Sequence, residues 1–347
     1  MGTSVYRGLC TGVTHLQEER RMIDRRGLVA SGIIITVLAP RSVKAQRPGK
    51  VLQVVFFSVA AGPNPLADSF RRGLKELGYS EGRDISIRYR WMAGHESQYD
   101  DVARELVQSE PDVIVTAGHP PAVAIKKATA QIPIVALAVV NPVGGGLAAS
   151  ISHPGGNLTG FSLEVTPETN AKMLELLHEA APKLTRIGAL WNSANPGSRF
   201  YLDAVKQAAQ SQKLTLNAYD VRRAEDIDTA FRSLRGNVEG LIVFPEGLLW
   251  TYRRNIVDAA REAQLATIFG YRDATEMGAL MSYGPDLVDL FRRGAAYVDK
   301  IIKGVKPAEL PIQQPAKFEL VINVKTATAL NIGIPPTLLA RADQVIE

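Results

Sequence analysis

The amino-acid sequence predicts an α/β fold made of two Rossmann-like lobes with parallel sheets and a ligand cleft between them. Short apolar runs rich in β-branched residues, typical of strands buried on both faces, alternate with stretches of helical periodicity. This order occurs twice, and corresponding strands begin at residues 51 and 186, 113 and 240, and 134 and 266. Such alternation predicts parallel sheets covered by helices on both faces, and two copies predict two similar lobes.

The first copy begins with the apolar run 51–59. A turn at 62–65 follows, and apolar residues then recur at helical spacing until Gly78 ends the helix. Alternating apolar residues predict a strand at 85–89. The remaining elements of this copy are a helix at 99–109, a strand at 113–117, a helix at 122–129 and a strand at 134–140.

The second copy repeats this order. Its predicted elements are strands at 187–191, 214–218, 241–244 and 266–270, and helices around 202–209, 227–234 and 255–264. The rest of the chain adds a strand at 279–283, a helix at 286–303 and a strand at 318–323, which allow the chain to cross back between lobes. We therefore expect lobe I to comprise residues 46–162 and 284–312, and lobe II to comprise residues 163–283 and 313–347.

Residues 22–46 have the pattern of a cleavable export leader. An arginine pair at 25–26 precedes the apolar run 28–38, and small residues precede a cut between Ala45 and Gln46. The run is much shorter than the roughly 20 residues that a membrane-spanning helix needs. The pattern predicts a soluble periplasmic protein. Both the general secretion route and the twin-arginine route fit.

This leader changes what the charge and the cysteine of the chain indicate. Met22 is a plausible initiator, so 1–21 would precede the true start and 1–45 would be absent from the exported protein. Seven Lys or Arg and three Asp or Glu lie within 1–45, so their removal lowers the formal charge from +5 to +1. A charge near zero gives no support for nucleic-acid binding. The single cysteine, Cys10, also lies in this segment, which excludes a disulfide or a cysteine metal site from the remainder.

Polar and aromatic residues follow the predicted strands in both copies, at the edge where open α/β sheets bind ligands. Amides, aromatic surface and a few charges suit a small polar or zwitterionic molecule better than a metal ion or a polyphosphate. Taken singly, each loop is explained by turn chemistry alone, but their repetition in both copies favours a binding cleft. Trp250 either lines this site or packs. The candidate ligand contacts are Ser58, Asn64, His119, Asn141, Trp191, Asn192, Asn195, Glu246, Arg272, Asp273 and Tyr283.

The motifs of common catalytic and cofactor sites are missing. The chain has no G-x-S-x-G elbow and no phosphate-binding P-loop, and the histidines after residue 46 lack the spacing of a helical zinc site. The run 144–149 matches G-x-G-x-x-A, and Glu164 follows about 20 residues on as in a dinucleotide fingerprint. However, 154–156 (Pro-Gly-Gly) would end any helix that opens from this run. We therefore expect no catalytic residue, no metal ligand and no cofactor.

Several stretches, in the right order, resemble the tryptophan/tyrosine-type group of ABC-transporter substrate-binding proteins. They are 111–117 (PDVIVTA), 133–146 (PIVALAVVNPVGGG), 154–162 (PGGNLTGFS), 278–285 (GALMSYGP), 303–311 (KGVKPAELP) and the tail 317–347. The resemblance begins near residue 50 and implies the type I periplasmic-binding-protein fold. It also implies an exported receptor that closes over a small molecule and delivers it to a membrane permease. Where the family commonly has a small acidic or amide run, this chain has 245–247 (Pro-Glu-Gly), which leaves the ligand open.

The residues and the resemblance together predict a monomeric solute receptor with an amino acid as the leading ligand class. Arg272 or a helix start would receive its carboxylate, and Asp273 or Glu246 its ammonium group. The lobes would hinge through crossovers near 162–166, 283–285 and 310–315. Two alternatives remain at this point: an exported α/β enzyme, and a ligand-sensing regulatory module built on the same two-lobed body.

Overall fold

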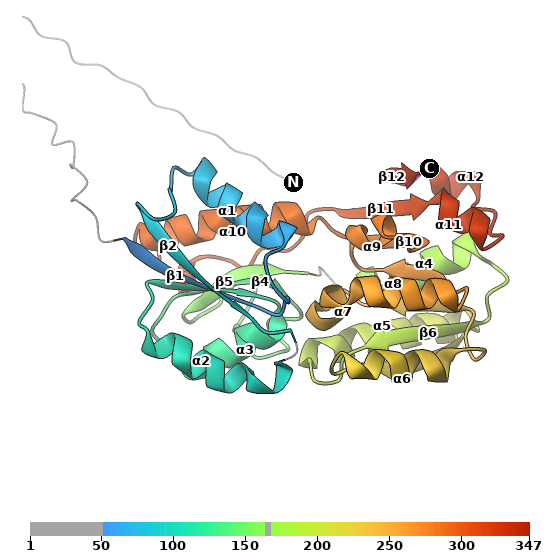
Figure 1. Ribbon diagram of the computed structural model, residues 1–347, viewed down its shortest axis with the longest axis horizontal. Helices are drawn as coiled ribbons and strands as arrows, with labels where there is room; N and C mark the ends of the chain where they lie inside the picture. The colour runs from blue at the N-terminus through green and yellow to red at the C-terminus, as the bar shows by residue number, and fades with distance from the viewer. Residues whose placement is uncertain (1–50, 94, 164–167) are drawn as a thin grey trace, which may run out of the picture. The chain divides into compact units, whose positions relative to one another are not determined.

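The computed structural model describes residues 51–93, 95–163 and 168–347 (Figure 1). The predicted leader at 22–46 and the fingerprint residue Glu164 lie outside these ranges. The described chain contains a five-stranded sheet with the strand order β2-β1-β3-β4-β5 and a seven-stranded sheet with the order β12-β11-β10-β9-β8-β6-β7. None of its helices is both long enough and apolar enough to span a membrane.

The five-stranded sheet of lobe I is parallel throughout and has helices on both faces. Helices α1 and α10 lie side by side on one face, and α2 and α3 cover the other (Figure 1). Along β1, Val54 and Phe56 belong to the buried cluster on the α1 and α10 side, whereas Val55 and Phe57 belong to the cluster on the α2 and α3 side. The elements are β1 (Leu52–Ser58), α1 (Pro65–Glu76), β2 (Ile85–Trp91), the 3-10 helix η1 (Glu96–Gln98), α2 (Tyr99–Gln108), β3 (Val113–Ala117), α3 (His119–Ala128), β4 (Ile134–Val139), β5 (Leu158–Ser162) and α10 (Leu287–Ile302).

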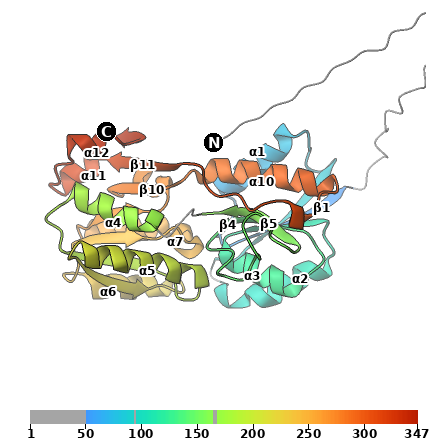
Figure 2. The same ribbon diagram turned by 180° about the vertical axis from the view of Figure 1, so that it is seen from behind.

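The seven-stranded sheet of lobe II is covered by α4 and α5 on one face, which Figure 2 shows side by side, and by α6 and α8 on the other. Two strands depart from the prediction of parallel sheets, because β11 pairs antiparallel with β10 and β12 runs parallel to β11. The chain returns to this sheet from lobe I. Strand β11 therefore begins at the edge of the sheet where β10 ends, and it runs in the opposite direction. The elements are α4 (Glu168–Ala180), β6 (Arg186–Trp191), α5 (Pro196–Ser211), β7 (Thr215–Asp220), α6 (Glu225–Leu234), β8 (Gly240–Val243), α7 (Gly247–Thr251), α8 (Arg253–Glu262), β9 (Ala266–Phe269), α9 (Arg272–Glu276), β10 (Met281–Pro285), β11 (Phe318–Asn323), α11 (Val324–Ala329), α12 (Pro336–Leu339) and β12 (Gln344–Ile346). The 3-10 helix η2 (Pro307–Glu309) follows α10 and contacts β5 of lobe I.

The predicted strands and long helices are confirmed with small shifts at their ends, but some elements are not predicted. Strand β5 reads as a loop because it is short and contains Gly160. That glycine has φ +142°, and a Cβ there would lie 1.9 Å from the carbonyl oxygen of Ala136, so only glycine fits between β4 and β5. No helix is predicted over α4, although Met173, Leu177 and Ala180 recur at helical spacing and are buried.

The chain passes between the lobes in three places. It leaves lobe I after β5, returns at Asp286 between β10 and α10, and leaves again before β11. Gln313 still exchanges backbone hydrogen bonds with Gly160 and Ser162 of lobe I, so the third crossing lies between Gln313 and Phe318. The exact lobe boundaries expected above stay a prediction.

Candidate functional site

A cavity lies where the loops of the two lobes meet, beyond the carboxyl ends of β1, β3, β8 and β9. Its volume is about 40 Å³, which is room for little more than a water molecule. An organic ligand would therefore fit between these residues only with the lobes further apart. Its lining consists of Phe56, Ser58, Val59, Asn64, Leu66, Ala117, Gly118, Ala138, Leu163, Pro245, Glu246, Gly247, Trp250, Tyr271, Leu287 and Phe291.

Two glycines let the loops approach one another beside this cavity. A Cβ on Gly247 would lie 2.8 Å from a methyl carbon of Val59, and a Cβ on Gly118 would lie equally close to its other methyl carbon. The hydroxyl of Thr251 also donates a hydrogen bond to the carbonyl oxygen of Val59, at 3.4 Å. The start of α7 in lobe II therefore rests directly on the loop that follows β1 in lobe I.

Glu246 is the charged residue of this cavity and is only 2% exposed. Its Oε2 caps α7 by accepting the N–H groups of Leu248 (2.9 Å) and Leu249 (3.1 Å). Its Oε1 accepts from the side-chain amides of Asn192 (3.1 Å) and Asn195 (3.4 Å). Burial raises the pKa of Glu246 above its usual value, and these four hydrogen bonds oppose that effect. The structure thus joins three predicted residues into one network around a carboxylate.

Tyr271 and Trp250 form an aromatic wall of the cavity from lobe II. The hydroxyl oxygen of Tyr271 is buried and has no hydrogen-bond partner among the described residues. Behind this wall the guanidinium of Arg253 stacks 4.0 Å from the ring centroid of Trp250 and pairs with Asp273 at 2.5 Å. Burial raises the pKa of Asp273, and the charge of Arg253 opposes that rise. Asp273, together with Arg272, lines an adjoining cavity that shares Trp250 and Tyr271.

Ser58 and Asn64 of lobe I also line the main cavity. The Oδ1 atom of Asn64 caps α1 by accepting the N–H groups of Leu66 (3.0 Å) and Ala67 (3.1 Å). The hydroxyl oxygen of Ser58 accepts the N–H of Ala60, at 3.2 Å. Both side chains therefore serve the turn after β1 as well as the cavity wall.

Four further predicted contacts lie elsewhere at the strand ends and line neither cavity. His119 is 1% exposed, its Nδ1 accepts the N–H of Val140 at 3.3 Å, and burial lowers its pKa to about 4. Asn141 accepts the N–H of Gly144 at 3.0 Å, which closes the turn after β4. Trp191 packs against the lobe II core, and Tyr283 against the ring of Phe318. Arg272 borders the adjoining cavity but makes ion pairs with Glu276 and Glu319.

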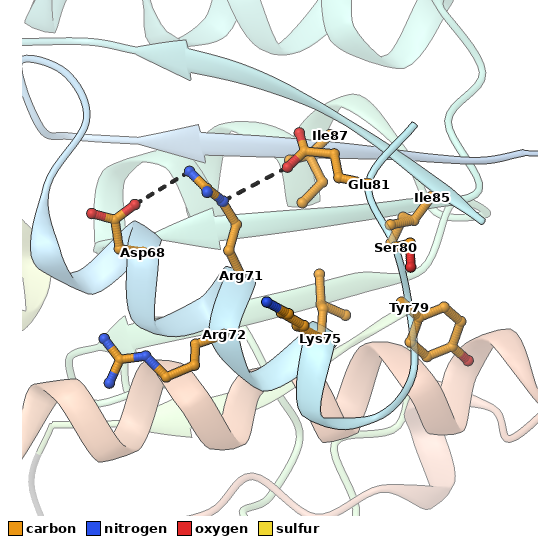
Figure 3. A pocket seen from close by; sticks show the side chains of 10 residues that line it. Asp68, Arg71, Arg72, Lys75, Tyr79, Ser80, Glu81, Ile85 and Ile87 are labelled. Carbon is orange, nitrogen blue, oxygen red and sulfur yellow. Dashed lines mark hydrogen bonds and ion pairs between the residues drawn. The ribbon is translucent and has the colours of Figure 1, made fainter. Parts of the chain in front are cut away.

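A different hollow on lobe I, shown in Figure 3, is larger but has another character. It lies between α1 and the chain that leads into β2. Arg71 spans it and pairs with Asp68 (3.3 Å) and Glu81 (3.7 Å), and all three side chains are about half exposed. These charges are exposed and already pair with one another, and the hollow lies on one lobe only. It therefore lacks the features of a solute site. No group of three or more metal-binding side chains occurs in the part of the chain that the structure describes.

The family described as ABC transporter substrate-binding protein matches residues 61–346. The chain belongs to this family. Its members are binding proteins and not enzymes, which excludes the alternative of an exported α/β enzyme. The predicted resemblance is therefore confirmed over most of the chain.

Individual relatives agree with this assignment. The tyrosine-binding protein of Clostridioides difficile (strain R20291) is 26% identical over 263 residues, which cover 76% of this chain and 75% of that protein. The ABC domain of Streptococcus pneumoniae, solved in complex with L-Trp, is 25% identical with a TM-score of 0.79 and covers 86% of this chain and 100% of that chain. A conserved domain protein of Vibrio cholerae is 28% identical with a TM-score of 0.79 and covers 85% and 100% of the two chains. The two-lobed type I periplasmic-binding-protein fold is thereby confirmed.

The principal cavity residue missing from the predicted contacts of this substrate-binding protein is Tyr271. It follows β9 by two positions, directly after Gly270, so the strand-end rule alone would have found it. The prediction names instead its neighbours Arg272 and Asp273, because charged residues suggest ligand contacts more readily. The apolar lining from Phe56, Leu163 and Phe291 carries no such signal, since these residues also match the pattern of an ordinary core.

Proposed function

We propose that this protein is the exported receptor of an ABC import system and that it closes over an amino acid in the cavity between its lobes. The observation that carries the proposal is the buried carboxylate of Glu246 beside the rings of Trp250 and Tyr271. A carboxylate suits the ammonium group of an amino acid, and the apolar wall suits an aromatic or branched side chain. Two relatives support the same ligand class, because one is named a tyrosine-binding protein and the other was solved in complex with L-Trp.

The three crossings between the lobes support a hinge mechanism. Short connections at the crossovers 162–166, 283–285 and 310–315 allow one lobe to rotate against the other while each sheet stays intact. Ligand bound between the lobes would stabilise the closed form by its extra contacts there. We propose that a membrane permease then accepts the closed, monomeric receptor. The leader pattern at 22–46, the cut before Gln46 and the family support delivery to the periplasm.

A melting-temperature screen tests the ligand class. The purified chain is heated with amino acids, sugars, small peptides and simple carboxylates in turn. A ligand at 100 times its dissociation constant should stabilise the protein by about 2.7 kcal/mol. For a chain of this size that corresponds to a rise in Tm of roughly 2–4 °C. If sugars or dicarboxylates raise the Tm while every amino acid leaves it unchanged, the amino-acid assignment is wrong.

A further inference from the structure

The carboxyl group of Glu246 in the cavity between the lobes has no cationic partner among the described residues. Within the described chain the lining contains no Lys or Arg, and Glu246 is its one acidic residue. All four hydrogen bonds to this carboxylate come from neutral donors, two backbone N–H groups and the amides of Asn192 and Asn195. Buried carboxylates in proteins are usually paired with a cation. Arg222 lines a neighbouring cavity with Glu246, but it is largely exposed and pairs with Asp220 at 3.4 Å.

A second observation points to a ligand at the same place. Tyr271 lines the cavity and is 2% exposed, and its buried hydroxyl oxygen has no hydrogen-bond partner among the described residues. Leaving a buried hydroxyl unpaired costs free energy that a bound polar group would restore. The rings of Phe56, Trp250 and Phe291 complete the lining, and aromatic faces attract organic cations.

Most groups that would receive a ligand carboxylate are, in contrast, already occupied. Asn64 takes the free N–H groups of α1 and Glu246 takes those of α7. The start of α9 at Tyr271 has no side-chain cap, but Asp273 lies in its first turn and disfavours an anion there. The start of α3 has Pro120 and Pro121, which have no N–H. Arg253 is committed to the carboxylate of Asp273 and, through Nη1, to the carbonyl oxygen of Trp250 at 2.7 Å. The start of α10 borders the adjoining cavity, where the cation Arg272 is paired with Glu276 and Glu319, and Asp273 and Asp286 disfavour an anion.

We propose that the cavity recognises its solute through a primary ammonium group on an apolar, ring-sized body, and that it makes no dedicated contact with a carboxylate. The ammonium lies between Glu246 and the Tyr271 hydroxyl, and the body lies against Trp250, Phe56 and Phe291. Amines that lack the carboxylate of the corresponding amino acid therefore bind at least as tightly as the amino acid itself. This inference rests on the proposed function, because it assumes that the solute binds in this cavity.

Calorimetric titration of the purified full chain with two matched sets of compounds tests the inference. One set is L-tryptophan, tryptamine and indole-3-propionate, and the other is L-phenylalanine, phenethylamine and 3-phenylpropionate. In each set only the amino acid and the amine carry an ammonium group. We expect the amine to match or exceed the amino acid in affinity and the acid to show no binding. If the amino acid binds tenfold or more tighter than the amine, or the acid binds as well as the amine, the inference fails while the proposed receptor function stands. If none of the six compounds binds, the inference fails, and the melting-temperature screen above decides the proposed function.

Two variants localise the interaction. Tyr271→Phe removes a hydroxyl that has no partner within the described chain, so the fold should be kept, and amine affinity should fall by about 2- to 12-fold. Tyr89→Phe is the matched control, because its hydroxyl is also buried and unpaired but lines neither cavity, so affinity should not change. Glu246→Gln should lower amine affinity by about 10- to 150-fold. Equal amine affinity in Tyr271→Phe and Tyr89→Phe would overturn the placement of the ammonium group, whether or not Glu246→Gln folds.

Discussion

The helix starts after β1 and after β8 use the same cap with different chemistry. At α1 the amide oxygen of Asn64 accepts the N–H groups two and three residues further on, at 3.0 and 3.1 Å. At α7 one oxygen of Glu246 accepts the corresponding pair at 2.9 and 3.1 Å. A neutral oxygen therefore suffices for the cap. The charge of Glu246 is not needed for it.

The two caps also differ in their surroundings. Asn64 is half-buried at the apolar edge of lobe I, whereas Glu246 is buried and holds two amides of lobe II with its second oxygen. Taking an unpaired charge out of water is costly, so it persists where something compensates it. Lobe I thus supplies mainly apolar wall and lobe II supplies the buried carboxyl group, which on the proposed function would select the solute. The predictions below test this difference, from the largest expected effect to the smallest.

Removing the charged cap should cost more stability than removing the neutral one. Glu246→Ala deletes the cap of α7 and leaves the amides of Asn192 and Asn195 without their acceptor. We expect the free energy of unfolding in urea to fall by about 3 kcal/mol, the sum of a lost cap and of unpaired buried donors. A loss no larger than that of a cap alone would show that the two asparagines are satisfied without the carboxylate.

Acid should destabilise lobe I through His119. Burial lowers its pKa to about 4 from the usual 6.5, so the unfolded chain binds the proton more tightly than the folded one. The stability is therefore complete above pH 6.5 and is lost as the pH falls from 6.5 towards 4. Between pH 7.5 and pH 5 the loss should be about 2 kcal/mol. In His119→Asn, which keeps an acceptor for the N–H of Val140, this part of the pH dependence should vanish; an unchanged profile would assign it to other groups.

The neutral cap should make a smaller contribution. Asn64→Ala should lower the free energy of unfolding by about 1 kcal/mol, the usual value for a lost N-cap. Asn64→Ser is the control, since its hydroxyl can cap the same N–H groups. Should Asn64→Ala prove as harmful as Glu246→Ala, the contrast between the two caps would be lost.

Arg272 should matter least. Its ion pairs with Glu276 and Glu319 lie near the surface, where such pairs contribute about 0–1 kcal/mol. Arg272→Ala should therefore change the Tm little and leave solute affinity unchanged. A tenfold loss of affinity for an amino acid, without loss for the amine, would make Arg272 the carboxylate receiver that the sequence suggests.

Much of the fold follows from local patterns, because strands buried on both faces and amphipathic helices leave clear periodicity. The antiparallel entry of β11 does not follow, since it depends on where the chain comes from after α10. Strand β5 is hidden by Gly160, whose presence reflects contact with Ala136 and not strand propensity.

The site is predictable only in part. The strand-end rule finds Asn64 and Glu246, yet it also selects His119 and Tyr283, which the structure places away from the cavities. The rule gives an edge of a sheet but not the direction of a side chain. The same rule also points to Tyr271, which the prediction passes over in favour of its two charged neighbours. Its burial and unpaired hydroxyl single it out only in the structure.

The most direct measurement uses Trp250 as a reporter in the cavity. The chain has three tryptophans, so Trp91→Phe with Trp191→Phe leaves Trp250 as the sole tryptophan. Titration with phenethylamine, which does not absorb where tryptophan is excited, should change its emission and protect it from a soluble quencher with the same dissociation constant as calorimetry gives. Calorimetric binding that leaves both the emission and the quenching of Trp250 unchanged would contradict a solute site between the lobes.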